Sequence, residues 1–171
     1  MRNRSAVVVA AFLAAVAMYA QTAPNVWKQY PYPSDGFAIS SPIQPTFSTQ
    51  TKPTDAGNVE MHTYMIPLNN NSVVMISASE VKGLEKFSPK DRLQKAKLGA
   101  LKAGNVTLTT EKEITLGPYP GLQYEASNQS LHVRARMYIV KNRLMQLLDI
   151  SPVSVAFSAD AERICTSFKV L

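Results

Sequence analysis

The sequence predicts an α+β fold, in which a mostly antiparallel sheet is covered by helices. Three observations lead to this prediction. Short apolar segments alternate with turn sequences, as they do in β-hairpins. The last third of the chain contains two consecutive hairpins whose residues pair in one consistent register. Two other segments, residues 88–105 and 159–167, repeat their apolar residues at helical spacing.

Turn sequences separate the first predicted strands. The strand pairs are 26–30 with 37–41 and 59–68 with 73–79. The first pair flanks the Pro-Ser-Asp-Gly turn at 33–36, in which proline fixes φ and glycine permits a left-handed backbone. The second pair flanks the polar stretch 69–72. A further strand is predicted over 107–116, and Gly117 ends it.

The most strongly determined part is a meander of three strands. Its expected turns lie at 128–129 and 141–142. These turns place Glu125 opposite His132 and Arg134 opposite Asp149. They also put a continuous set of apolar residues on one face, namely Leu122, Tyr124, Ala126, Leu131, Val133, Ala135, Ile139, Leu144, Leu148 and Ile150. We expect helices to shield this face from water.

Capping residues mark the first helix. Ser88 can cap it, Pro89 suits its first position, and Gly104-Asn105 ends it. Its expected buried side carries Leu93, Ala96, Ala100 and Leu101, while Lys95 and Lys102 point outwards. The second helix should lie back on the sheet through Ala161, Ile164, Cys165 and Phe168.

Residues 1–20 have the layout of a secretory signal peptide. A basic head, 1–4, precedes an apolar run that ends in small residues. We expect cleavage after Ala20, with Ala17 as the competing position. The rest of the chain is therefore expected to be exported, to a periplasm or to the medium.

Residues 21–171 are expected to form a single domain, because roughly 150 residues can bury a sufficient core. Loss of Arg2 and Arg4 with the signal peptide would lower the formal net charge from +6 to +4. The remaining charges are interspersed, so nucleic-acid binding is not expected. No later stretch is long enough to span a membrane. Cys165, the one cysteine, lies far from the signal, so a lipoprotein is not expected.

The sequence contains no recognisable catalytic or metal-binding motif. His62 and His132 are its only histidines, and neither has a second ligand residue at metal-site spacing. We interpret both as ordinary residues of a sheet face. There is no Gly-x-Ser-x-Gly sequence and no phosphate-binding glycine loop, and Cys165 lies on an apolar helix stripe. No metal, cofactor or catalytic residue is therefore predicted.

The most positive local feature is the row His132, Arg134 and Arg136 on one strand face. One interpretation is a docking patch for an acidic partner or an anionic ligand. The alternative is neutralisation across strands, by Glu125 for His132 and by Asp149 for Arg134. That pairing would leave Arg136 as the least compensated charge.

Two tyrosines stand between prolines, Tyr32 at 31–33 and Tyr119 at 118–120. Proline restricts the backbone, so each ring is held on a stiff stretch. Rigid exposed rings are good binding anchors. The same rings can instead pack over the edge of a core. Both tyrosines are therefore candidate contact residues.

The order of several short motifs resembles a known group of proteins. The motifs are Trp27-Lys-Gln-Tyr30, Asp35-Gly36-Phe37, Ser41-Pro42, Gly117-Pro-Tyr-Pro-Gly121, Arg136-Met-Tyr-Ile-Val140, Asn142-Arg-Leu144 and Ser167-Phe168-Lys169. They resemble the PsbP-like/Mog-like group, over about residues 27–171. The resemblance implies an α/β/α sandwich and a non-catalytic role in binding or stabilising other proteins. It transfers no functional residue.

The sequence therefore favours an exported, non-catalytic accessory domain that binds or stabilises another protein or an envelope component. One alternative is a periplasmic small-molecule binder with a cleft between sheet and helix, lined by Tyr64, Tyr124 or Tyr138. A third hypothesis is a hydrolase whose site residues are distant in sequence.

Overall fold

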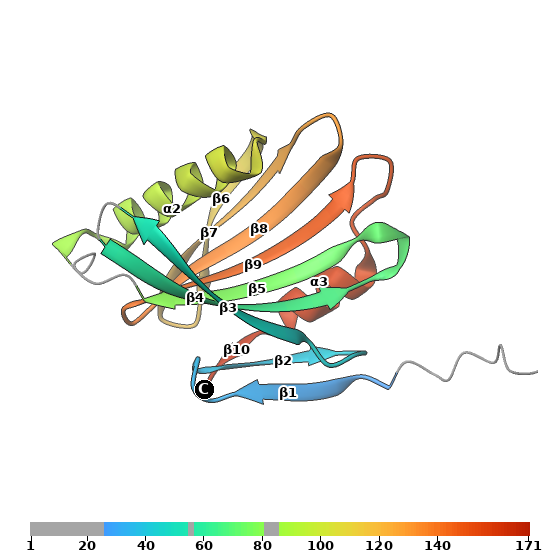
Figure 1. Ribbon diagram of the computed structural model, residues 1–171, viewed down its shortest axis with the longest axis horizontal. Helices are drawn as coiled ribbons and strands as arrows, with labels where there is room; N and C mark the ends of the chain where they lie inside the picture. Colours follow the sequence, from blue (N-terminus) through green and yellow to red (C-terminus); the bar gives the residue numbers. More distant parts are fainter. Residues whose placement is uncertain (1–25, 55–56, 81–85) are drawn as a thin grey trace, which may run out of the picture.

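Seven antiparallel strands form the central layer, in a computed structural model that describes residues 26–54, 57–80 and 86–171 (Figure 1). The strands are β3 (Thr46–Thr54), β4 (Gly57–Pro67), β5 (Val73–Glu80), β6 (Thr107–Leu116), β7 (Tyr119–Ser127), β8 (Leu131–Val140) and β9 (Arg143–Pro152). Their order across the sheet is β3-β4-β5-β9-β8-β7-β6. The predicted signal peptide and its cleavage position lie outside the described residues.

A smaller sheet packs against the first one. It consists of β1 (Lys28–Tyr32), β2 (Phe37–Ser41) and β10 (Lys169–Val170), in the order β1-β2-β10. The predicted turn at 33–36 joins β1 to β2, and Gly36 has the left-handed φ of 73° that this turn requires. The sequence predicted neither β10 nor β3, because a two-residue strand and a polar edge strand lack an apolar pattern.

The two helices lie on opposite faces of the large sheet (Figure 1). Helix α2 (Pro89–Gly104) is capped by Ser88, whose side chain accepts a hydrogen bond from the N–H of Asp91, and it ends at the left-handed Asn105. Helix α3 (Ala159–Thr166) is capped in the same way by Ser158. Both predicted helices are confirmed. A short 3-10 turn, η2 (Asn69–Asn71), joins β4 to β5.

Each face of the sheet has its own core. The first core lies between the large sheet, the small sheet and α3, and its fully buried side chains include Phe37, Ile39, Ile66, Ile76, Met145, Leu147 and Ile164. The second lies beneath α2, where Leu93 packs with Leu122, Tyr124, Ala126, Ala135, Met137 and Ile139. Burial of these apolar side chains is the main stabilising contribution to both cores, at about 1.5–3 kcal/mol for each side chain.

The predicted register is confirmed in the second hairpin of the meander. Arg134 lies opposite Asp149, and Ala135 lies opposite Leu148. Ala135 is fully buried, as expected. Val133 and Leu148 are only half-buried, so helix α2 shields this face in part rather than entirely.

The predicted register of the first hairpin is wrong by two residues, because its loop is longer than expected. Glu125 lies opposite Arg134, and His132 lies opposite Ser127. The cause is Asn128, whose side-chain oxygen accepts hydrogen bonds from the backbone N–H groups of residues 130 and 131. A shift of two residues leaves every side chain on its predicted face.

Candidate functional site

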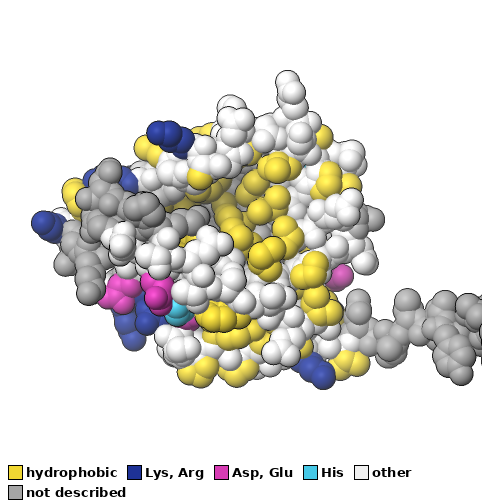
Figure 2. Space-filling model, viewed as in Figure 1, with side chains coloured by type: hydrophobic (Ala, Val, Ile, Leu, Met, Phe, Trp, Pro, Cys, Tyr) yellow, Lys and Arg dark blue, Asp and Glu magenta, His cyan; other side chains and the backbone are white. Residues whose placement is uncertain are grey.

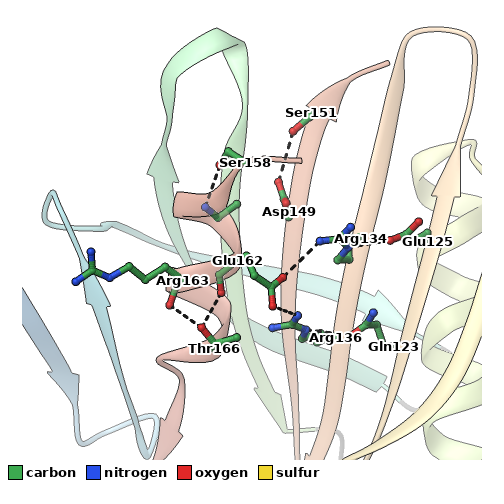
Figure 3. A network of polar contacts seen from close by, with 11 residues as sticks. Gln123, Glu125, Arg134, Arg136, Asp149, Ser151, Ser158, Glu162, Arg163 and Thr166 are labelled. Atoms are coloured by element: carbon green, nitrogen blue, oxygen red, sulfur yellow. Dashed lines mark hydrogen bonds and ion pairs between the residues drawn. The ribbon is translucent and has the colours of Figure 1, made fainter. Parts of the chain in front are cut away.

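Arg134 and Arg136 point from β8 toward α3, where both meet Glu162 (Figure 3). An Nη atom of Arg136 donates to one Glu162 oxygen over 2.6 Å, and an Nη atom of Arg134 lies 3.4 Å from the other. Within the sheet, the Nε atoms donate to Glu125 over 2.8 Å and to Gln123 over 3.1 Å. One carboxylate from α3 and one from β7 therefore compensate the two guanidinium groups.

His132 takes no part in this ion-pair network. The His132 ring stacks on the ring of Phe157, with centroids 4.0 Å apart. The guanidinium of Arg134 lies 4.3 Å from the centroid of the Phe157 ring. The Nε2 atom of His132 is buried without a hydrogen-bond partner. The loop before α3 therefore covers this end of the row.

Three predictions about the row are corrected by these contacts. Arg134 forms its ion pairs with Glu125 and Glu162 rather than with Asp149. Glu125 neutralises Arg134 rather than His132, because of the two-residue register shift. Arg136 is not the least compensated charge, because α3 supplies Glu162, which pairing between strands does not reveal. The row ties α3 to the sheet, and a contact of the row with a partner stays a prediction.

Asp149 lies next to this network on β9 and is 2% exposed (Figure 3). Its carboxylate is 3.5 Å from the hydroxyl of Ser151. Burial raises its pKa from 3.8 to about 6, against the opposing attraction of Arg134. Ionisation of Asp149 therefore costs the folded state more than the unfolded state, and this cost is absent below pH 3.8 and complete above about pH 6.

We expect Asp149→Asn to stabilise the protein at pH 8, by about 1–3 kcal/mol, because the amide has similar shape and no charge to desolvate. The gain should shrink as the pH falls through 6 and vanish near pH 3.5. Chemical denaturation at several pH values measures it. Asp160→Asn, at an exposed position of α3, is the control, and an Asp149→Asn variant less stable than wild type at pH 8 would contradict the expectation.

Both candidate tyrosines pack against the core that faces α3. The Tyr32 ring lies 4.2 Å from the ring of Tyr64 and 5.1 Å from that of Phe37, and its hydroxyl is buried without a partner. Tyr119 is half-buried at the start of β7. These positions fit the core-edge interpretation, and a role in partner contact stays a prediction.

A second polar cluster joins the small sheet to the large one. Asp35, in the turn between β1 and β2, is 4% exposed and lies 2.8 Å and 2.9 Å from Nδ1 of His62 on β4. The hydroxyl of Tyr64 donates a short hydrogen bond to the same carboxylate. Glu60 lies 2.9 Å from Nε2 of His62. Arg143 adds an ion pair to Asp35 at 3.7 Å and donates to the backbone oxygen of residue 34.

Two carboxylates hold the two ring nitrogens of His62. Only the imidazolium can donate from both nitrogens, and the hydrogen bonds to Asp35 and Glu60 raise the pKa of His62 above 6.5. A cavity of about 150 Å³ adjoins the cluster. Because Nε2 faces a carboxylate rather than a hydroxyl or thiol, the arrangement is not that of an acyl-transfer triad. The cluster is a polar clamp between the sheets.

Sequence reasoning missed this clamp. The alternation of Glu60, His62 and Tyr64 on one strand face was visible. Asp35 and Arg143 are separated from His62 by 27 and 81 positions in the sequence, so only the tertiary structure brings them together. The interpretation of His62 as an ordinary sheet-face residue is therefore replaced by a paired histidine.

Between α2 and strands β6 and β7 lies a cavity of about 380 Å³. Its lining consists of Lys90, Leu93, Gln94, Glu113, Ile114, Thr115, Pro120, Gly121 and Leu122. None of the three tyrosines expected in such a cleft lines it, and Tyr64, Tyr124 and Tyr138 are all buried in the cores. The rim carries an ion pair of 2.7 Å between Lys90 and Glu113.

The α2 side of the large sheet is only partly covered. Helix α2 packs on β7 and β8, and the core beneath it extends to Leu144 and Leu148 of β9. On the same side of the sheet Thr63, Ser77 and Ser79 are buried, so only the part of β9, β5 and β4 beyond them is uncovered. Register places two apolar rows across these strands, which we call the open face: Met65, Met75 and Leu148 in one row, and Pro67, Val73, Ile150 and Val133 in the other. Figure 2 shows hydrophobic side chains gathered over β5, β9 and β8, in the middle of the molecule.

Exposure confirms that this surface is accessible. Met65 is 43% exposed, and Met75, Leu148 and Ile150 are half-buried. By contrast, Met145 and Leu147 on the opposite side of the same sheet are fully buried. The sequence predicted that this face is apolar but not that part of it is left uncovered.

Two further observations concern the part of the chain that the structure describes. No group of three or more His, Cys, Asp or Glu side chains there is arranged to hold a metal ion. No helix within those ranges is both long enough and apolar enough to cross a membrane. Burial raises the pKa of the Cys165 thiol to about 12, so at neutral pH this cysteine lacks the thiolate that a nucleophile requires.

Comparison with solved structures identifies the fold. The chain matches the solution structure of cyanobacterial PsbP (CyanoP) from Synechocystis sp. PCC 6803 with a TM-score of 0.60 and 11% identity, over 89% of this chain and 96% of that chain. It therefore has a PsbP-like fold, as the resemblance in sequence implied. A protein of unknown function from Pseudomonas aeruginosa, PA94, matches 62% of this chain and 84% of its own, with a TM-score of 0.41 and 8% identity. No protein-family model and no curated protein matches the sequence.

Proposed function

We propose that this protein is an exported, non-catalytic accessory domain that binds another protein through the open face. The observation that carries this proposal is the pair of apolar rows left uncovered beside α2. An apolar patch of this kind on a small domain costs solubility, and such patches commonly mark protein–protein contacts. The PsbP-like fold supports a non-catalytic role, and the signal-peptide pattern of residues 1–20 supports export.

The composition of the open face suits a protein partner. Its core is formed by methionine and branched aliphatic side chains, with Met65 and Met75 adjacent across β4 and β5. Methionine side chains are flexible and polarisable, so they adapt to the apolar side chains of a partner. The rim next to it is formed by α2, which carries the exposed lysines Lys95 and Lys102. An apolar centre with a polar rim is the usual anatomy of a protein interface.

The cavity between α2 and β6–β7 favours a second candidate function, the binding of a small molecule. Its volume of about 380 Å³ is sufficient for a small metabolite. Leu93, Ile114 and Leu122 give it an apolar floor, and Lys90 and Glu113 offer both charge signs at the rim. A thermal-shift screen with a metabolite panel tests it. A shift that disappears in Thr115→Trp, in which bulk is added at an exposed residue of the cavity lining, would favour this function.

The experiment that tests protein binding uses a charge placed on the open face. We expect a stoichiometric partner to co-purify with the tagged chain from the exported fraction of its native cells. Met65→Lys should lower its recovery about tenfold, because the partner would bury an unpaired ammonium group. Met65 is 43% exposed, so the variant should fold normally.

The matched control is Leu98→Lys, on the solvent side of α2, where Leu98 is 61% exposed. This change adds the same charge outside the open face and should leave recovery unchanged. Equal recovery with Met65→Lys and wild type would contradict the proposed interface. Retention of the chain in the cytoplasm would contradict export.

A further inference from the structure

The uncovered width of the sheet matches one helix. Neighbouring strands lie about 4.8 Å apart, so the open face spans roughly 14 Å across β9, β5 and β4, and along the strands it ends where Thr63, Ser77 and Ser79 are buried. Two packed helices lie about 8–10 Å apart. One further helix could therefore lie alongside α2 on the open face, whereas two could not.

The side of α2 that borders the open face is lined by small residues. Arg92 donates to the backbone oxygen of Asn142 in the β8–β9 turn over 3.2 Å, which directs this side of α2 toward β9. Ala96, Gly99 and Ala103 follow Arg92 at spacings of four, three and four residues, so they lie on the same side. A Cβ atom built on Gly99 meets no atom within 4 Å.

The opposite side of α2 faces β6 and is already occupied. Gln94 donates to Glu111 over 2.7 Å, and the buried Lys97 forms an ion pair with the same carboxylate. The small-residue flank is therefore the side that is left for a second helix, and small residues let two helix backbones approach closely. It is a wall of a groove whose floor is the open face.

Basic residues outnumber acidic ones on the outer side of α2. On the α2 side of β4, β5 and β9, every residue over the paired part of each strand is uncharged. The wall, by contrast, carries the exposed Lys95 and Lys102 together with Asp91 on its outer side, and the ammonium group of Lys95 lies 3.6 Å from the centroid of the Phe87 ring. A helix lying beside α2 would pair with this wall through acidic side chains.

We propose that the groove seats a single amphipathic helix of the partner protein, apolar toward the sheet and acidic on the flank beside α2. This inference rests on the proposed function and specifies the partner's chemistry. The apolar side of the helix would contact Met65, Met75 and Ile150, and its acidic flank would approach Lys95 and Lys102.

The first test uses designed peptides as probes of the full chain. One peptide, about as long as α2, carries a Leu/Ala face and a Glu flank; a second replaces Glu by Lys, and a third has the first composition in scrambled order. Methyl NMR should show shifts at Met65 and Met75 with the Glu peptide and none at Met145, which is fully buried on the opposite side. We expect the Lys peptide to bind about tenfold more weakly and the scrambled peptide not to bind.

The decisive variant is Gly99→Leu. The added side chain would project into the groove, so the Glu peptide should bind about tenfold more weakly. Folding should not suffer, because space is open around Gly99 and leucine favours a helix more than glycine does. Leu98→Phe, which adds bulk on the solvent side of the same helix, is the matched control and should bind normally.

The outcomes separate this inference from the proposed function. If Met65→Lys releases the native partner but Gly99→Leu does not, the partner binds the open face without a helix beside α2, and the inference is wrong. Equal binding of the Glu and scrambled peptides would overturn it as well. If neither variant affects the native partner, the proposed interface itself fails.

Discussion

Asp35→Ala should be among the most destabilising single substitutions in this protein, at about 3–4 kcal/mol. The substitution removes a buried carboxylate that is hydrogen-bonded to His62 and Tyr64 and forms an ion pair with Arg143. The Tyr64 hydroxyl would then be buried without an acceptor, because Tyr64 is 3% exposed. The clamp between the two sheets would open. Urea denaturation followed by tryptophan fluorescence measures the loss.

The contribution of the clamp should depend on pH in a defined direction. Its two carboxylate hydrogen bonds raise the pKa of His62 above its unfolded value of 6.5. The stabilisation is therefore complete below about pH 6.5 and is lost as the pH rises through the higher folded pKa. A double-mutant cycle of Asp35→Ala with His62→Gln should show strong coupling at pH 5.5 and weaker coupling at pH 9.

The control for this series is Asp160→Ala, which removes an exposed carboxylate from the first turn of α3. It should cost only about 0.5 kcal/mol, through the helix dipole. A loss at Asp35 no larger than that at Asp160 would show that the clamp adds nothing to stability. Coupling that rises with pH would contradict the assignment of a charged His62.

Gly121→Ala is the second substitution with a large expected effect, about 3 kcal/mol of lost stability. Gly121 lies directly opposite Tyr138 in the β7–β8 ladder. A Cβ atom at this position would be 2.5 Å from Cδ1 of Tyr138 and 2.7 Å from the backbone oxygen of Met137. The backbone oxygen cannot move without breaking the ladder, and the tyrosine ring is buried against the core.

Gly99→Ala is the matched glycine control, because no atom lies near its missing Cβ. In the middle of helix α2 this change should stabilise the protein by about 0.5–1 kcal/mol. Thermal denaturation of the two variants side by side should therefore show shifts of opposite sign. A Gly121→Ala variant that melts with the wild type would mean that β7 and β8 pack more loosely than the close approach indicates.

Local patterns were sufficient to predict much of the secondary structure. Helix α2 begins and ends where its cap residues Ser88 and Asn105 predicted, since capping depends on neighbours in sequence. The β8–β9 register followed from a two-residue turn at 141–142. The β7–β8 register was missed because Asn128 closes a longer loop through its own side chain, which alternation alone does not reveal.

The candidate sites depended far more on tertiary structure. The row of His132, Arg134 and Arg136 was found in the sequence, but α3 brings Glu162 onto it and turns an exposed charge row into an internal tie. The clamp of Asp35 and His62 was not found, because its members come from different sheets. Asp35 and His62 interact because the fold brings the two sheets together, and no local sequence pattern indicates this contact.

The amino-acid sequence by itself determined the α+β class, the helix limits, the side of the sheet on which each strand residue lies, and the PsbP-like resemblance. These properties depend on periodicity and on neighbours, which act over a few residues. Only the tertiary structure decided which apolar residues are covered. Helix α2 is too narrow to span the whole sheet, so the apolar residues Met65, Met75 and Ile150 remain accessible, while Ser77 and Ser79 on the same side are buried.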